Sequence, residues 1–122
     1  MARSISTDDG RAALAAVATA GAAAESPART DVATAVRYLL QLLAEKAPGN
    51  SVEVRVPPFG AVQVVEGPRH TRGTPPNVVE MDAQTWIALA TGVRGWSEAV
   101  AAGRIQASGT RADLTALLPL RP

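Results

Sequence analysis

The sequence predicts an α+β domain in which helices and strands occupy separate stretches of the chain. Helical patterns dominate residues 1–49, strand patterns follow through residues 51–81, and short helical patterns return after residue 82. Strands that follow one another directly, with helices grouped around them, are typical of an antiparallel or mixed sheet covered by helices on one face. A length of 122 residues fits one domain with one modest core. We therefore expect a single domain over residues 1–122.

An Ala-rich stretch predicts the first helix. Ser6, Thr7 or Asp8 supplies its N-cap, and acidic charge in the first turn suits the helix dipole. The high helix propensity of alanine extends the helix until "ESPART" (25–30) ends it. Large apolar side chains are scarce here, so this helix packs closely but contributes little core. We expect it either to cross the exposed face of the sheet or to contact a second copy of the chain.

The second helix has the strongest pattern in the chain. Thr30 is the expected N-cap, the helix runs through "DVATAVRYLLQLLAEKAPG", and Pro48-Gly49 ends it. Its large apolar residues recur at the spacing of a core-facing stripe: Val32, Val36, Leu39, Leu40 and Leu43.

The next segments predict three strands in succession. In "SVEVRV" (51–56) valine alternates with charged residues, which is typical of a strand with one solvated face. The turn "PPFG" (57–60) leads to a returning strand, "AVQVVE" (61–66), and so predicts a hairpin. After a loop, "NVVEM" (77–81) predicts a short third strand.

The remaining segment predicts a helix pair, a strand and a last helix. Asp82 caps a helix over residues 83–92, which Gly92 ends. Ser97 is expected to cap a short helix that stops at Gly103, and "RIQAS" (104–108) predicts a strand.

The sequence "TRADLTALLPL" (110–120) then predicts a final helix. Thr110 and Asp113 have the spacing of a capping box, although aspartate is a weaker closing partner than glutamate.

The composition excludes several classes of function. Cysteine is absent and His70 is the only histidine, which removes disulfides, thiol nucleophiles and an ordinary zinc site. The net charge is +1 and the arginines are spread along the chain, so nucleic acid is not an expected partner. No apolar run approaches the ~18 residues that span a membrane. We expect a soluble, cytoplasmic protein without a cofactor.

The last third of the chain carries a recognisable order of motifs. In "VVEMDAQTWIALATGVRGWSEAVAAGRIQASGTRADLTALLPL" (78–120), an Asp-led helix ending in "LATG" precedes "AVAAGRIQASG" and a leucine-rich end. This order resembles the sterol carrier protein (SCP) superfamily. The segment "NSVEVRVPPFGAVQVVEGPRHTRGTPPNVVE" (50–80) is similar, more particularly, to the small stand-alone actinobacterial members of that superfamily. The order of motifs in the last third is also similar to the accessory domain of mycothiol-dependent maleylpyruvate isomerases. The resemblance covers residues 30–120, which leaves residues 1–29 as an extra Ala-rich helical extension.

The resemblance implies a twisted mixed or antiparallel sheet with helices on one face. In that family an apolar tunnel between sheet and helices holds a fatty acyl chain, a sterol or another lipid, and no chemistry is performed. The positions that match this lining are Val54, Val62, Val64, Trp86, Leu89, Trp96, Val100, Leu114, Leu117 and Leu118. Each of them also fits ordinary core packing, and the two tryptophans fit both roles at once.

The loop "EGPRHTRGTPPN" (66–77) gathers the rarest polar residues of the chain. Arg69 and Arg72 suit a fork for an anionic head group, with His70 as a further donor. Alternatively, the arginines pair with glutamates of adjacent strands, and the prolines and glycines only set the path of the loop.

Three hypotheses of function follow. The first is a non-enzymatic binder of a small apolar or amphipathic ligand. The second is an interaction or accessory module whose own side chains fill the cavity, and which docks a partner or a second copy as a homodimer. The third is a small enzyme centred on His70, which would need a carboxylate within hydrogen-bond reach of the imidazole. The missing phosphate, metal and nucleophile motifs favour the first two.

Overall fold

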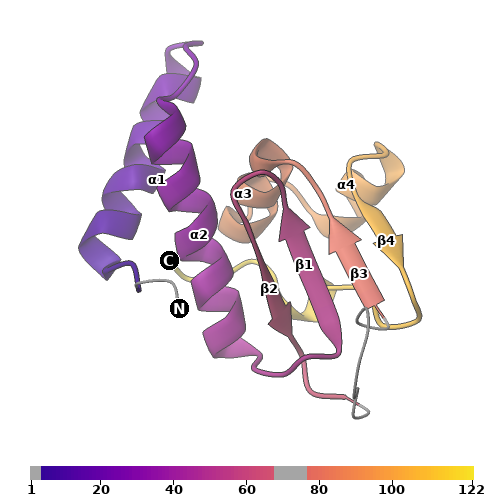
Figure 1. Ribbon diagram of the computed structural model, residues 1–122. Coiled ribbons are helices and arrows are strands. Elements are labelled where there is room, and N and C mark those ends of the chain that lie inside the picture. Colours follow the sequence, from indigo (N-terminus) through magenta and orange to yellow (C-terminus); the bar gives the residue numbers. More distant parts are fainter. Residues whose placement is uncertain (1–3, 68–76) are drawn as a thin grey trace.

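The computed structural model describes residues 4–67 and 77–122. Two helices lead into three strands, and a helix pair, a fourth strand and a single 3-10 turn follow (Figure 1). The elements in chain order are α1 (Thr7–Ala22), α2 (Arg29–Lys46), β1 (Val52–Val56), β2 (Gly60–Val64), β3 (Asn77–Glu80), α3 (Ala83–Thr91), α4 (Trp96–Ala101), β4 (Gln106–Ser108) and the 3-10 turn η1 (Thr115–Leu117).

The strands form one four-stranded mixed sheet in the order β2-β1-β3-β4. The strand pairs β1/β2 and β3/β4 are antiparallel, whereas β1 and β3 run parallel. The predicted α+β class and the mixed sheet are thus confirmed. The view in Figure 1 looks onto the open face of the sheet, with α3 and α4 behind it and α2 beside β2.

The covered face of the sheet is built almost entirely from valine. In the register of the sheet, Val54 lies opposite Val62 on β2 and Val79 on β3. The alternation predicted for residues 51–56 is confirmed, since Val52, Val54 and Val56 are all completely buried. The predicted stripe of α2 packs into the same core, where Val36, Leu39, Leu40 and Leu43 are buried and Val32 is partly buried.

Helix α1 packs along α2, on the side away from the sheet (Figure 1). Its N-cap is Ser6, one of the three predicted candidates, whose hydroxyl accepts from the Asp9 amide at 3.1 Å. Gly10 meets the ring of Tyr38 so closely that a Cβ at position 10 would overlap the ring atoms. The expectation that α1 crosses the open face of the sheet is therefore wrong, because α1 follows the small-residue contact with α2.

The segment before α1 is fixed by one side chain of α2. Gln41 binds both backbone groups of Ile5, accepting from the Ile5 amide at 2.9 Å and donating to the Ile5 carbonyl at 3.0 Å. Because Ile5 precedes the N-cap, its amide and carbonyl have no partner within the helix, and Gln41 satisfies both.

Two predicted helix caps are wrong. Helix α2 begins at Arg29, because Ala28 is already extended and its carbonyl accepts from the Asp31 and Val32 amides at 3.0 and 3.1 Å. Thr30 therefore lies inside the first turn. Similarly, Ser97 lies inside α4.

The cap of α4 is Gly95 instead. Its amide donates to Oε1 of Glu98 at 3.4 Å, so a carboxylate three residues along satisfies the cap residue. The cap predicted for α3 is confirmed, since Oδ1 of Asp82 accepts from the Thr85 amide at 2.8 Å. Gly92 ends α3 with a positive φ of 83°, a conformation that glycine adopts without strain.

The final helix predicted over residues 110–120 is also wrong, because only the turn η1 forms there. Asp113 does not close a capping box. Its Oδ1 accepts from the amide of Thr115 at 2.8 Å and from the Thr115 hydroxyl at 2.5 Å, a local pattern that competes with helix. Pro119 then favours the extended conformation found at Leu118.

The tail, residues 109–122, follows β4. It is held mainly by hydrogen bonds to distant segments of the chain and not by the bonds of a helix. The Leu120 amide donates to the Ala90 carbonyl at the end of α3 at 2.8 Å. The buried side chain of Asn77 accepts from the Arg111 amide at 2.9 Å and donates to the Ser51 carbonyl at 2.8 Å. Asn77 thus joins β1, β3 and the tail, and Leu114 and Leu120 complete the core from this segment.

Candidate ligand-binding site

The residues expected to line an apolar site converge on one cluster, with a single exception. Five of them are almost completely buried: Val54, Val64, Trp86, Leu89 and Leu114, at 0 to 2% exposure. Four more are partly buried and pack against that core: Val62, Trp96, Leu117 and Leu118. Val100 differs, since it lies on α4 with 48% of its surface exposed. The fold therefore brings β1, β2, α3 and the tail together in one apolar cluster, and the ligand-lining role of these residues stays a prediction.

Trp86 is the largest fully buried side chain and occupies the interior between helices and sheet. Its indole Nε1 donates to the Val36 carbonyl of α2 at 3.3 Å, so its one polar atom is satisfied. Around it most valines of the sheet face and the α2 residues Leu39, Leu40 and Leu43 are buried, whereas Val62 and Leu42 are partly buried. This region of the interior is filled by the protein's own side chains.

A short stretch around α4 exposes apolar surface. Val93 precedes the helix and is 82% exposed, and Val100 lies on the helix itself. Trp96, one turn before Val100, is half-buried against the core. Trp96 is therefore placed at the boundary between core and solvent, while Trp86 is fully enclosed.

The polar candidates Arg69, His70 and Arg72 lie outside the described residues. The pairing of these arginines with glutamates of the adjacent strands (Glu53, Glu66 or Glu80) therefore stays a prediction. Glu53 forms an ion pair with Arg55 two residues along its own strand, on the open face of the sheet.

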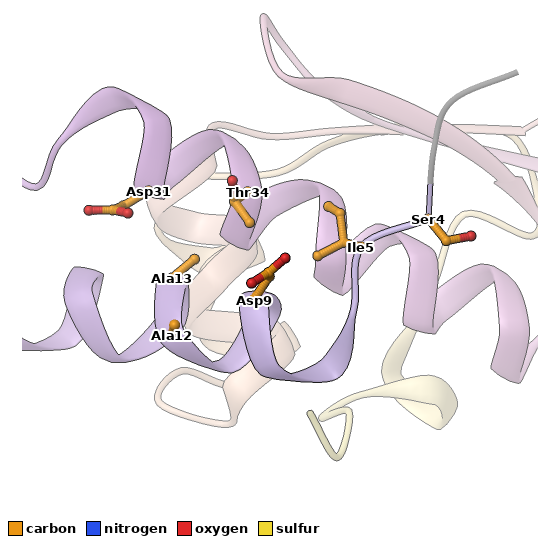
Figure 2. A pocket seen from close by; sticks show the side chains of 7 residues that line it. All are labelled: Ser4, Ile5, Asp9, Ala12, Ala13, Asp31 and Thr34. Atoms are coloured by element: carbon orange, nitrogen blue, oxygen red, sulfur yellow. The ribbon is translucent and has the colours of Figure 1, made fainter.

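A hollow of about 480 Å³ lies between α1 and α2, where the sequence predicts no site. Apart from Ile5, its lining consists of small and acidic residues: Ser4, Asp9, Ala12, Ala13, Asp31 and Thr34. Figure 2 shows Thr34 of α2 opposite Asp9 and Ile5, with Asp31 at one end. The alanines of α1 are too short to fill the space, which is why the hollow exists.

Chemically, this hollow offers acceptors but no reacting pair. Two carboxylates and two hydroxyls line it, without an imidazole, an amine or a guanidinium among the lining residues. A general base also needs a positioned partner within hydrogen-bond reach, and the lining supplies none. The small side chains of α1 were visible in the sequence, but the position of α1 on α2 was not.

Two further observations concern the described ranges, 4–67 and 77–122. Within them, no group of three or more histidine, aspartate or glutamate side chains gathers as a metal-ligand set. No helix in these ranges combines the length and the apolar character needed to cross a membrane.

The small α+β domain, with a four-stranded mixed sheet, helices on one face and an apolar cluster between them, is the architecture that the resemblance to sterol carrier proteins implies. A family model described as "Bacterial SCP ortholog" matches residues 28–120. The chain belongs to this family of bacterial SCP orthologues. The match begins after α1, at residue 28. The similarity to the accessory domain of maleylpyruvate isomerases is not shown by this match and stays a prediction. A comparison with curated proteins finds no match.

Proposed function

We propose that the protein is a non-enzymatic binder of a small apolar or amphipathic ligand, such as a lipid or fatty acyl chain. The observation that carries this proposal is the family match over residues 28–120, on a fold whose sheet turns a valine face toward its helices. Sterol-carrier-like proteins are generally carriers without enzymatic activity. Such a binder gains about 25 cal/mol for each Å² of apolar ligand surface that it removes from water.

The partly buried members of the apolar cluster are the proposed point of contact. Trp96, Leu117 and Leu118 each pack on the core and still reach solvent. A ligand chain laid against them buries surface on both partners without first displacing Trp86. The fully buried members then form the wall behind the ligand.

Binding of a dansyl-labelled undecanoate tests this proposal. The tryptophans of the chain are Trp86 and Trp96, and both should transfer excitation energy to a bound dansyl group. We expect saturable binding at one probe per chain, together with a lipid that co-purifies and is seen by native mass spectrometry. Trp96→Phe should weaken energy transfer more than the matched variant Trp86→Phe, because Trp96 lies at the proposed point of contact and Trp86 lies behind it. Absence of both uptake and co-purifying lipid would contradict the proposal.

The filled interior favours a second candidate, an interaction or accessory module. Trp86, Leu89 and Leu114 leave 0 to 2% of their surfaces exposed, so the protein's own side chains occupy the space that a carrier would keep for its ligand. This candidate predicts that the purified chain binds a partner or a second copy of itself, the homodimer named above. Light scattering over a concentration series tests whether the chain binds a second copy of itself. A molar mass that stays at the monomer value excludes self-association. Without uptake of any acyl probe, a dimer would favour this candidate over the carrier.

The enzyme hypothesis centred on His70 rests on the sequence alone. His70→Ala should leave probe binding unchanged if the protein is a carrier whose ligand lies on the apolar cluster.

A further inference from the structure

A second hollow lies between the C-terminal half of α2 and the tail. Its volume is about 430 Å³, and its lining comprises Leu42, Lys46, Leu120 and Arg121. Leu42 and Lys46 are four residues apart and so lie on the same face of α2. Leu120 is buried at 6% exposure and Leu42 is partly buried, whereas the two cationic residues are exposed. The hollow therefore has an apolar floor and a basic rim.

Lys46 is held in place by the tail. Its Nζ donates to the Leu117 carbonyl at 2.7 Å. An ammonium group has three donors, so this bond fixes the charge and leaves two donors for another acceptor. Within the described residues, the ion pair of the structure joins Glu53 and Arg55, so neither Lys46 nor Arg121 is neutralised by a carboxylate there.

Compensation of the helix dipole explains only part of this arrangement. Lys46 lies in the last turn of α2, where a cation offsets the partial negative charge of the helix end, about half an elementary charge. Glu45 is exposed at the preceding position and further lowers the local potential. Arg121 adds a second full positive charge from a different segment, and the dipole of α2 does not account for that residue.

Leu117 of the tail connects this hollow to the apolar cluster. Leu117, whose carbonyl binds Lys46, is one of the partly buried residues that pack on the core. A molecule with an acidic head and an apolar chain would place its head between Lys46 and Arg121. Its chain would run past Leu42 and Leu120 toward Leu117, the part of the proposed contact that adjoins the hollow. Carboxylates pair well with guanidinium and ammonium groups, and the chain removes apolar surface from water.

We propose that Lys46 and Arg121 form the head-group end of the ligand site and that the ligand is a single-chain amphipathic carboxylate. This inference rests on the proposed carrier function and gives the head-group role to Lys46 and Arg121 in place of the loop residues Arg69 and Arg72.

Calorimetric titration of the full chain with dodecanoate, dodecanol and acetate tests the inference. Dodecanoate should bind more tightly than dodecanol, and acetate should bind least, because both the head and the chain contribute. Lys46→Met and Arg121→Met should each weaken dodecanoate about five-fold and leave dodecanol within about two-fold. Lys46→Arg should retain the binding of dodecanoate. Arg104→Met, which removes an exposed cation from outside the hollow, is the matched control and should change nothing.

Each other outcome identifies what has failed. Dodecanoate binding that survives both methionine variants, or that is lost only in an Arg69→Met/Arg72→Met variant, overturns the assignment of the head-group site and leaves the carrier function standing. Equal binding of dodecanoate and dodecanol overturns the anionic head group in the same way. Failure of dodecanoate and dodecanol alike to bind overturns the carrier function itself. Shifts of the Leu42, Lys46, Leu120 and Arg121 amide resonances on addition of dodecanoate would support the location.

Discussion

The two helix interfaces of the molecule are built from side chains of different size. Between the sheet and its helices, valines, leucines and Trp86 interlock with almost no exposed surface. Between α1 and α2, glycine and alanine meet a tyrosine ring, and a hollow of about 480 Å³ remains beside them. Both interfaces hold two layers together, but only the first is filled by large apolar side chains, many of them completely buried.

This contrast shows that close approach and complete filling are separate properties. Gly10 lets α1 approach the Tyr38 ring, but short side chains elsewhere on the helix cannot reach across the gap. The interface between the sheet and its helices is filled, because branched and aromatic side chains span the larger separation between a helix and a sheet. Adding an atom at the contact between α1 and α2 should therefore destabilise the fold. Removing atoms from the interface between the sheet and its helices should destabilise it as well.

The largest effect is expected from Trp86→Ala. Removing the indole leaves a cavity in the filled interior and frees the Val36 carbonyl from its donor. We expect a loss of about 3–5 kcal/mol in the free energy of unfolding, measured by urea denaturation. Trp96→Ala is the matched control, because the same side chain is removed from a half-buried position. Equal losses in the two variants would show that Trp86 does not fill the interior as described.

Gly10→Ala should have the next largest effect, although it adds only a methyl group. The new Cβ would overlap the ring of Tyr38, and overpacking of this kind costs about 1–3 kcal/mol. A gain of about 1 kcal/mol in helix propensity offsets part of that cost. Hydrogen exchange should show faster opening of α1 amides, with the strands of the sheet little affected. Uniform protection loss across sheet and α1 would contradict the separation of the two interfaces.

Gly21→Ala makes the same chemical change near the other end of α1 and should have the opposite sign. A Cβ at this position meets nothing within 4 Å. The variant should therefore gain about 0.5–1 kcal/mol from helix propensity and from the lower entropy of the unfolded chain. Urea denaturation of the two glycine variants side by side measures the difference. A loss of stability in Gly21→Ala would show that α1 has a contact near residue 21 that the structure lacks.

The features that the sequence predicted correctly depend on local signals. The alternation at Val52, Val54 and Val56 predicted which face of β1 is buried. Asp82 and Gly92 predicted where α3 begins and ends. Each signal acts within a few residues of the chain, so no knowledge of distant contacts was needed. The family motif added the arrangement of the sheet and its helices.

The features that the sequence missed depend on contacts between distant segments. The packing of α1 on α2 follows from the fit of Gly10 to Tyr38, 28 positions apart in the numbering of the chain. The hollows depend on how far two elements stand apart, which no local pattern encodes. The tail kept the leucine spacing of a helix, but its bond from the Leu120 amide to Ala90 replaced the helical bond.

Asp113 provides the smallest and most local prediction, because its bonds to Thr115 replace the helix that the sequence favoured. The hydroxyl of Thr115, and then its amide, stabilise the charged carboxylate and hold the pKa of Asp113 below its ordinary value of 3.8. The folded chain thus binds this proton less readily than the unfolded chain. The resulting stabilisation is fully present above pH 3.8 and is lost as the pH falls through the lower pKa of the folded state.

Asp113→Asn should remove this contribution and therefore flatten the acid limb of the stability curve. Because Asp113 is exposed, solvent screening limits the difference near neutral pH to a few tenths of a kcal/mol, about what an exposed pair contributes. Urea denaturation of wild type and variant at several pH values measures this difference, with Glu25→Gln, at an exposed position after the end of α1, as the control. The wild type should have the higher free energy of unfolding near neutral pH, and this difference from Asp113→Asn should disappear only in acid. An advantage that persists below the folded pKa would show that Asp113 stabilises the tail by its shape and not by its charge.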